Sequence, residues 1–505
     1  MGKFKRVMVA NRGEIAIRVF RALNELGIRT VAIYSNEDKY SLFRSKADEA
    51  YLIGEGRGPV DAYLNIEDII SLAIKKGVDA IHPGYGFLSE NPEFAMRCEQ
   101  EGIEFIGPTA EMMDRLGDKI KSKIVAKLVG VPVIPGYEKV VKTADEARMH
   151  ATECGYPLML KAAAGGGGRG MRIVRDESEL ESAFLSAKRE AKKAFGIDHI
   201  FMEKFIEKPK HVEVQVLGDK YGNIVHMFER DCSIQRRHQK VVEFTPAFSI
   251  PQEIRNNIHQ DALKIAKAVK YRSAGTIEFL VDNQGNYYFI EMNPRIQVEH
   301  TVTEMVTGID IVQAQIQIAQ GCALNSPEIG INSQQDIILN GYSIQCRITT
   351  EDPSNNFAPD TGKIESYRTG SGFGIRLDGG NGFTGAEISP YYDSLLVKNI
   401  SWSKSFQDAI KKSIRSITET QITGVKTNIG FLINVLNHPQ FLNGECHTGF
   451  IEENPDLISL TQKTDDESRL LKFLGNVVVN ETMGIKLQYT MSPRCPKSRV
   501  LVRAI

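Results

Sequence analysis

A predicted β-hairpin past the middle of the chain constrains its fold most strongly. Two β-rich runs, Thr276–Val281 and Tyr287–Ile290, flank the turn residues 283–286, and this pattern is typical of a hairpin. A turn centred within that segment pairs Glu278 with Glu291, so two carboxylates would lie roughly 5 Å apart, where like charges repel. We therefore expect a cation between them.

Four polar residues beyond the hairpin share the parity of Glu291. Side chains alternate along a strand, so in an extended chain they would line one face: Asn293, Arg295, Gln297 and Glu299. Such a row predicts either a functional site or a face turned to solvent.

Length, net charge, cysteine spacing and hydrophobicity exclude several classes of protein. The 505 residues are enough for three or four domains, and the formal net charge of −1 gives no overall field that would attract nucleic acid or an anionic membrane. The seven cysteines are scattered without metal-ligand or redox-motif spacing, which predicts free thiols in a reducing compartment. No apolar run approaches the roughly 18 residues of a membrane span.

The N-terminus reaches a strand-like segment within a few residues of Met1, which leaves no room for a signal or transit peptide. We therefore expect a cytoplasmic protein, or a mitochondrial matrix protein if a eukaryotic chain has been processed.

Strands and helices alternate over the first 110 residues, which predicts βαβ units and a parallel sheet. The expected strands are Arg6–Ala10, Thr30–Tyr34, Ala80-Ile81 and Ile103–Ile106, and the expected helices are Glu14–Leu26 and Ile66–Lys75. The turn at 11–13 has one glycine where a dinucleotide fingerprint has three, so we do not expect NAD binding. The loop 82–86 follows a strand, where α/β sheets place ligands.

A helix is expected from Ala110 to about Val129, and the Pro- and Gly-containing segment 131–136 marks a boundary. Residues 135–205 form a small α+β unit with strands at Pro157–Ala162 and Met171–Val174. A β-rich region covers about 206–452. The polar segment 461–468 is a linker, and 469–480 begins something else.

A glycine loop separates the two strands of the small unit. It holds five glycines in the six residues 165–170, with Lys161 before it and Arg169 within it. Backbone N–H groups of such a turn form a nest for anions. A P-loop is excluded because the next element is a strand, not a helix. A flexible hairpin lid over phosphates is therefore expected, and a disordered surface hairpin is the alternative.

Two further segments are less specific. Glu203–Ile206 suits adenine and ribose recognition, although a surface ion pair is equally compatible. Residues 229–240 are basic, but acids interrupt them and aromatic residues for base stacking are missing. A small-anion pocket with Lys240 and His238 fits better than nucleic acid, and a solvated charged strand is the alternative.

The hairpin acids offer hard oxygen ligands, which suit Mg²⁺ or Mn²⁺ bound together with substrate phosphates. That metal would supply the expected cation. Glu299 could then act as a general base and Arg295 as an anion clamp.

Taken together, these motifs resemble the biotin carboxylase component of the biotin-dependent carboxylases, an ATP-grasp family. The resemblance covers about residues 4–452 and rests on segments 9–16, 82–91, 165–170, 236–240 and 291–300. Segments 345–353, 388–396 and 473–480 are most similar to the pyruvate carboxylase members of the family.

The resemblance implies an α/β and α+β multidomain fold. It comprises an N-terminal doubly wound parallel-sheet domain (1–120), an ATP-grasp domain (121–320) whose lid spans about 135–205, and a β-rich C-terminal domain (321–452). A linker, the start of a following domain and an atypical tail would fill 453–505.

The resemblance also implies the ligands and the residues that bind them. Bicarbonate would be held by Lys240, Arg295, Gln297 and Val298, biotin by Tyr85 and Arg347, and one or two Mg²⁺ or Mn²⁺ ions by Glu278, Glu291 and Asn293. ATP would contact Lys119, Lys161, Gly165, Gly166, Gly167, Gly168, Gly170, Met171, Glu203, Lys204, Ile206, His211, Gln235, His238, Glu278 and Glu291.

In the implied reaction, Glu299 deprotonates bicarbonate, which attacks the γ-phosphate of ATP to give carboxyphosphate. Its breakdown gives CO₂, and the phosphate takes the proton from biotin. Arg295 stabilises the biotin enolate, so Lys240, Arg295 and Glu299 are the catalytic residues. This is the first half-reaction of pyruvate carboxylase.

The resemblance implies partners as well. They are a biotin carboxyl carrier domain, a carboxyltransferase domain and a second copy of the chain, with Arg18 and Arg21 near the dimer interface. No Ala-Met-Lys-Met biotinylation motif is present, so the biotin would lie on another chain or on a missing part.

The alternatives are a biotin carboxylase subunit of acetyl-CoA or another acyl-CoA carboxylase, a carboxylate–amine ligase, a non-catalytic nucleotide-binding module and, least compatible, a nucleic-acid-binding protein.

Overall fold

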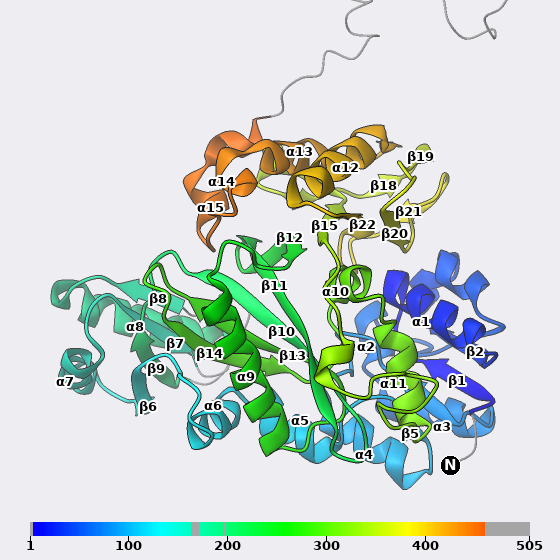
Figure 1. Ribbon diagram of the computed structural model, residues 1–505, viewed down its shortest axis with the longest axis horizontal. Coiled ribbons are helices and arrows are strands. Elements are labelled where there is room, and N and C mark those ends of the chain that lie inside the picture. The colour runs from blue at the N-terminus through cyan, green and yellow to red at the C-terminus, as the bar shows by residue number, and fades with distance from the viewer. Residues whose placement is uncertain (1–3, 163–170, 196–197, 460–505) are drawn as a thin grey trace, which may run out of the picture. The chain divides into compact units, whose positions relative to one another are not determined.

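The computed structural model (Figure 1) describes residues 4–162, 171–195 and 198–459. The chain divides into the units Met1–Ser459 and Leu460–Ile505. The glycines expected to cradle phosphates, the linker at 461–468 and the tail therefore lie outside the described residues. Within those residues, no helix is long and apolar enough to cross a membrane.

The N-terminal region contains the predicted parallel sheet, in the strand order β3-β2-β1-β4-β5. The strands are β1 (Arg6–Val9), β2 (Arg29–Tyr34), β3 (Glu49–Leu52), β4 (Ala80–His82) and β5 (Glu104–Phe105). The helices are α1 (Gly13–Glu25), α2 (Pro59–Tyr63), α3 (Ile66–Lys75) and α4 (Pro92–Gln100). The order reverses between β1 and β4, and a doubly wound sheet places its ligand at that point.

The loops after β1 and β4 meet at this reversal. The Asn11 side-chain amide donates to the backbone oxygens of Pro83 (2.7 Å) and Tyr85 (2.8 Å). The turn after β1 therefore fixes the loop that carries Tyr85.

The single helix expected over 110–129 is wrong, because two helices are present: α5 (Ala110–Gly117) and α6 (Lys119–Leu128). Asp118 between them has an extended ψ of 121°, and its Oδ1 accepts from the backbone N–H groups of Ile120 (2.9 Å) and Lys121 (2.8 Å). Asp118 is therefore an N-cap that starts a new helix.

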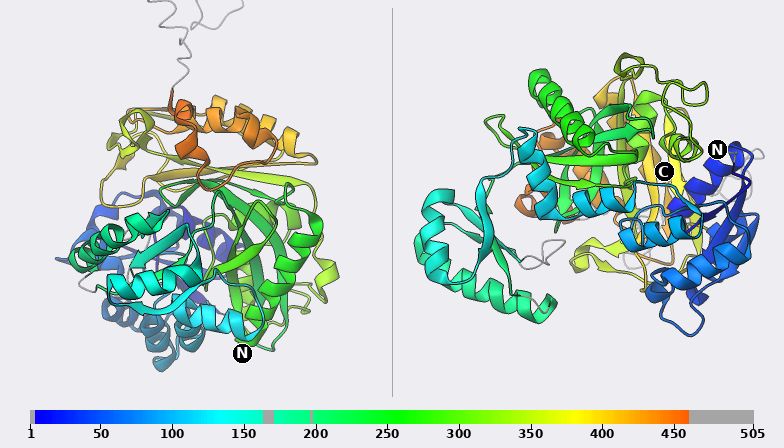
Figure 2. Two further views of the ribbon diagram at one scale, coloured as in Figure 1. Left: turned by 90° about the vertical axis from the view of Figure 1, so that its left-hand side faces the viewer. Right: turned by 90° about the horizontal axis from the view of Figure 1, so that it is seen from below.

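The small unit is a four-stranded antiparallel sheet in the order β6-β9-β7-β8. Its strands are β6 (Gly136–Val141), β7 (Leu158–Ala162), β8 (Met171–Val174) and β9 (Ile200–Lys204), and α7 (Ala144–Cys154) and α8 (Glu177–Phe195) pack on it (Figure 2). β7 and β8 pair as predicted for the strands on either side of the glycine loop.

An eight-stranded sheet forms the rest of the scaffold, in the order β14-β13-β10-β11-β12-β15-β22-β20. Its strands are β10 (Lys210–Gly218), β11 (Ile224–Arg236), β12 (Gln239–Thr245), β13 (Ser273–Val281), β14 (Tyr287–Asn293), β15 (Tyr342–Thr349), β20 (Ile375–Gly379) and β22 (Leu395–Ser403).

The associated helices are α9 (Gln252–Ala268), α10 (His300–Thr307), α11 (Ile311–Ala319), α12 (Phe406–Glu419), α13 (Ile429–Asn437), α14 (Pro439–Leu442) and α15 (Phe450–Glu453). Short strand pairs complete this region: β16 (Glu351–Asp352) with β17 (Ala358–Pro359), β18 (Gly362–Lys363) with β21 (Glu387–Ile388), and β19 (Ser366–Arg368) with β23 (Gln421–Thr423).

Alternation along β10 explains how one sheet serves both core and site. Val212, Val214 and Val216 belong to the apolar core that also contains Ile258 and Ile265 of α9. Their neighbours Glu213 and Gln215 are fully buried as well, but they lie on the opposite face because strand side chains alternate. That second face carries the polar cluster described below.

Candidate active site

A row of charged residues crosses four strands of the large sheet in register. Glu291 on β14 faces Glu278 on β13, as predicted, and Glu278 faces Glu213 on β10, which faces Arg230 on β11. A bulge after Glu278 shifts the register toward the turn, so Phe279 pairs with Phe289 and not with residue 290. The uniform register expected for the hairpin is therefore wrong between the bulge and the turn.

Lys240 is a cation beside this row of acids. Its ammonium contacts the carboxylates of Glu213, Glu278 (3.1 Å) and Glu299 (2.8 Å). A lysine ammonium has three N–H groups, so each can face one carboxylate. Burial opposes the charge of Lys240, but the three carboxylates raise its pKa well above the usual value. A side chain thus supplies a cation beside Glu278.

Glu278 gathers several of the predicted ligand residues. Its Oε1 accepts from the side-chain amides of Asn293 (2.8 Å) and Gln297 (2.8 Å), and its Oε2 lies 2.7 Å from Nε2 of His211. The side-chain amide nitrogen of Gln235 lies 2.5 Å from the other ring nitrogen of His211. Burial opposes ionisation of Glu278, but Lys240 and His211 hold its pKa well below the ordinary range.

The extended face predicted beyond Asn293 is wrong, because β14 ends there. Pro294 cannot donate to a strand ladder, and the Arg295 N–H donates instead to the Asn293 backbone oxygen (2.8 Å). Glu299 is the N-cap residue of α10. A turn, and not a strand, therefore directs Gln297 and Glu299 into the site.

Glu299 is buried between two cations. Its Oε1 accepts from Lys240 (2.8 Å) and its Oε2 from Arg347 (3.2 Å). Burial opposes its charge, but Lys240, Arg347 and Arg230 lower its pKa far below the usual value. These cations favour the charged form of Glu299, so the side chain is held as a carboxylate, the form that can accept a proton.

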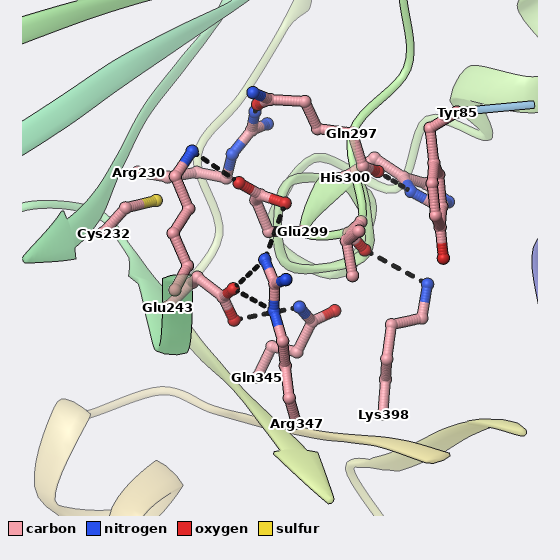
Figure 3. Close-up of polar contacts among 12 residues, drawn as sticks. Tyr85, Arg230, Cys232, Glu243, Gln297, Glu299, His300, Gln345, Arg347 and Lys398 are labelled. Atoms are coloured by element: carbon pink, nitrogen blue, oxygen red, sulfur yellow. Dashed lines mark hydrogen bonds and ion pairs between the residues drawn. The ribbon is translucent and has the colours of Figure 1, made fainter. Parts of the chain in front are cut away.

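Arg347 joins two buried acids, and Figure 3 shows its guanidinium between Glu243 and Glu299. Its Nε donates to Glu243 Oε1 (2.6 Å), and the Gln345 amide donates to Glu243 Oε2 (2.9 Å). Arg295 lies 3.0 Å from the carboxylate of Glu90 and 3.2 Å from Oδ1 of Asn293. Arg295, predicted to bind bicarbonate, and Arg347, predicted to lie near biotin, are therefore both held by acids.

Arg230 is fully buried, and all of its donors are used. A guanidinium has five N–H groups, and the five acceptors, at 2.5–3.1 Å, are the side chains of Glu213, Gln215, Thr276, Gln297 and Thr303. Arg230 thereby ties the turn after β14 to strands β10 and β13 and to helix α10.

The predicted nucleotide residues of the small unit are partly brought together. The Glu203 carboxylate pairs with Lys161 and, at 2.7 Å, with Lys123. Met171 faces Lys161 across β7 and β8. Of the other predicted nucleotide residues, Lys119 begins α6, Lys204 and His238 are exposed, and Ile206 is buried.

Two predicted site or interface residues, Tyr85 and Arg18, are paired with carboxylates. Tyr85 donates its hydroxyl to Glu14, and burial together with the Glu14 charge keeps its pKa well above the usual value. Arg18, expected near a dimer interface, is buried and contacts Glu304 (2.8 Å) and Asp310 (2.6 Å). Arg21 is exposed.

His82, at the end of β4, is expected to make the free energy of unfolding depend on pH. It is fully buried, its Nδ1 accepts from the Gly84 N–H (3.0 Å), and burial lowers its pKa to about 4. Above the unfolded-state pKa of about 6.5, His82 is neutral in both states and the fold has its full stability. As the pH falls from there toward 4, the unfolded chain binds a proton that the buried ring does not, so the free energy of unfolding decreases. We expect this loss to reach about 2 kcal/mol at pH 5.

Urea unfolding at pH 7.5 and pH 5 measures that loss. His82→Asn should show a smaller drop than the wild-type chain, whereas His199→Asn, at an exposed position, should show the wild-type drop. Equal drops in wild type and His82→Asn would contradict the role of His82.

Several residues that contact the predicted site residues were not themselves predicted: Glu213, Glu243, Arg230, Glu90 and Lys123. Glu213 did have a sequence signal, because an acidic residue between the valines of β10 is unusual in a buried strand. The others contact partners far away in sequence, which no local pattern reveals.

Three family models match the chain. They are the N-terminal domain of biotin carboxylase (residues 3–113), the ATP-binding domain of the carbamoyl-phosphate synthase L chain (118–327) and the C-terminal domain of biotin carboxylase (345–453).

Curated relatives include the pyruvate carboxylase of Bacillus subtilis, 57% identical over 481 residues that cover 95% of this chain and 42% of the relative. The mitochondrial pyruvate carboxylase of Homo sapiens is 54% identical, over 97% of this chain and 42% of the relative. The chain thus spans about two fifths of the length of the curated relatives it matches.

Solved structures of pyruvate carboxylase and of a biotin carboxylase domain are similar to this chain in both sequence and fold. Pyruvate carboxylase of Rhizobium etli with acetyl coenzyme A is 49% identical (TM-score 0.87), over 99% of this chain and 45% of that one. The biotin carboxylase domain dimer of Hydrogenobacter thermophilus 2-oxoglutarate carboxylase, with MgADP, ADP and bicarbonate, is 51% identical (TM-score 0.86), over 92% of this chain. Because this chain also covers 100% of that domain, it belongs to the biotin carboxylase family of ATP-grasp proteins.

Proposed function

We propose that the chain catalyses ATP-dependent carboxylation of biotin by bicarbonate, the first half-reaction of pyruvate carboxylase. The observation that carries the proposal is the buried Glu299 carboxylate between Lys240 and Arg347. A base that must stay ionised inside the protein needs such cations, and the same cations can hold an oxyanion substrate.

In the proposed reaction, Glu299 takes the proton of bicarbonate while Lys240, Arg295, Gln297 and Val298 hold the anion. A bicarbonate oxygen then attacks the γ-phosphorus of ATP, the bond from phosphorus to the ADP oxygen breaks, and carboxyphosphate forms. Carboxyphosphate separates into CO₂ and phosphate. The phosphate takes the proton of the biotin ureido nitrogen, which then bonds to CO₂.

The remaining assignments follow the family resemblance. The nucleotide would contact Lys119, Lys161, Met171, Glu203, Lys204, Ile206, His211, Gln235, His238, Glu278, Glu291 and the glycines of the 165–170 loop. Biotin would lie near Tyr85 and Arg347, whose side chains are close enough for the arginine charge to act on the Tyr85 pKa. We assign the domains as 1–120, 121–320 and 321–452, and 453–505 would lead into a following domain.

The residues of the hairpin fit a divalent cation. Glu278 and Glu291 face each other across β13 and β14, and Asn293 contacts Glu278. Carboxylate and amide oxygens are ligands for Mg²⁺ or Mn²⁺, which when bound would neutralise phosphate charge. These three residues would hold it.

We further propose that biotin is presented by a carrier domain outside this sequence, that a carboxyltransferase domain uses the product, and that two copies of the chain pair through the biotin carboxylase region. We also propose a location in the cytoplasm or in the mitochondrial matrix, because the similar pyruvate carboxylases include a bacterial protein and a mitochondrial one.

ADP release by the purified 505-residue chain tests the proposed function. With ATP and Mg²⁺, we expect ADP release to require bicarbonate and to rise when free biotin is added. Release that is indifferent to both would refute the proposal, and release that depends on an added amine would indicate a carboxylate–amine ligase.

Replacing Glu291 by Gln tests the metal assignment. The change removes one hard anionic ligand, so we expect the Mg²⁺ concentration for half-maximal ADP release to rise at least about tenfold. Calorimetry of Mg²⁺ binding in the presence of ADP gives a second readout. An unaltered Mg²⁺ titration in both would exclude Glu291 as a ligand.

A further inference from the structure

Lys398, on β22, is a fully buried lysine next to the proposed substrate site. Its ammonium donates to the backbone oxygen of Val298 at 3.1 Å, the contact drawn from Lys398 in Figure 3. It also lies 2.9 Å from Oε2 of Glu14 and 3.8 Å from Oδ2 of Asp378. Lys398 therefore joins the turn after β14, helix α1 and strand β20.

Of the two acids, Glu14 depends more on Lys398. Asp378 already has Arg376, whose guanidinium donates to both of its oxygens at 2.8 and 3.0 Å. Among the described residues, the structure shows no other cation in an ion pair with Glu14, and Glu14 is buried. A buried carboxylate without a counter-charge is strongly unfavourable.

Glu14 also holds Tyr85. Its Oε1 accepts a hydrogen bond from the Tyr85 hydroxyl, while its Oε2 faces Lys398. Because the pKa of Tyr85 is raised well above its usual value, the hydroxyl stays protonated and donates to Glu14. The orientation of Tyr85 therefore depends on a carboxylate whose charge is balanced by Lys398.

We infer that Lys398 is a positioning residue for both substrates of the proposed reaction. It fixes Val298 of the bicarbonate set directly and Tyr85 of the biotin set through Glu14. The inference rests on the proposed function, and it is independent of the nucleotide, whose proposed ligands lie on other elements.

Lys398→Met tests the inference in the 505-residue chain. We expect the KM values for bicarbonate and for free biotin each to rise at least about tenfold, while the KM for ATP stays within about twofold. A merely structural role would instead change all three constants or only the unfolding temperature. Lys426→Met, which alters an exposed lysine paired with Asp352, is the matched control and should leave all three unchanged.

The double variant Glu14→Gln/Lys398→Met separates the two effects and covers the case in which the single variant does not fold. The introduced glutamine carries no charge, yet its side-chain carbonyl can still accept from Tyr85. We expect a higher unfolding temperature than for Lys398→Met, a biotin KM restored toward wild type, and a bicarbonate KM that stays raised, because no donor reaches Val298.

An unchanged bicarbonate KM in either folded variant, or an unchanged biotin KM in Lys398→Met, would overturn the inference, as would an ATP KM raised as much as the other two in Lys398→Met. These results are distinct from a failure of the proposed function. That failure would already appear in the wild-type chain, as ADP release without bicarbonate dependence, and would remove the basis of the inference.

Discussion

Glu299→Gln is expected to lower bicarbonate-dependent ADP release by about 10²- to 10⁴-fold, with ATP binding near the wild-type value. The amide keeps the shape of the side chain but cannot take a proton from bicarbonate. The nucleotide is expected to bind almost normally, because Glu299 is absent from its proposed ligands and is held by Lys240 and Arg347. Steady-state ADP release and calorimetry with ADP measure the two effects.

An exposed glutamate provides the control for this change. Glu365 lies outside the cluster, so Glu365→Gln should retain wild-type turnover. Turnover by Glu299→Gln within a few-fold of wild type would remove Glu299 as the base. An equal loss of turnover and nucleotide binding would instead mean that the variant disturbs the site as a whole.

Arg230→Met is expected to cause the largest loss of stability, about 3–5 kcal/mol in the free energy of unfolding. The change leaves Glu213, itself fully buried, with Lys240 as its only cation in the described part of the chain. It also removes the donors to Gln297 and Thr303. Urea unfolding, monitored by circular dichroism, gives the free energy.

Arg415→Met is the matched control, since Arg415 pairs with Glu419 on the surface of α12. Exposed ion pairs contribute little, so we expect a change within about 0.5 kcal/mol. Arg230→Lys keeps the charge but has fewer donors, and it should fall between Arg230→Met and wild type. If Arg230→Met were as stable as the control, the five hydrogen bonds would not hold the turn after β14.

The pairing of Glu278 with Glu291 could be predicted because the hairpin is local and its turn residues set the register. The bulge next to Glu278 could not, since the turn residues give no signal for a register shift between Glu278 and Phe279. The path beyond Asn293 was predicted wrongly from parity alone, although Pro294 already argued against a continued strand. Asp118 likewise carried a readable capping signal that the longer helical pattern concealed.

The partners of the cluster were harder to predict, because they are far apart in the chain. Glu299 and Arg347 are 48 residues apart, and Lys398 and Val298 are 100 apart. The residue pattern beyond the hairpin already suggested Glu299 as a base, whereas Arg347 was identified only through the family resemblance. The sequence placed Arg230 only in a basic segment. In the structure it is buried and donates to five acceptors, so it holds neighbouring elements of the site together.

The continuous eight-stranded sheet limits how this protein can be divided. In the pairing of β12 with β15, the pairs Val242–Cys346 and Glu243–Gln345 join segments matched by two different family models. Cutting the chain between them would open two long sheet edges and separate Glu243 from Arg347. In recombination or domain-exchange experiments, residues 118–453 therefore have to be taken from one parent protein, even though two family models divide this region.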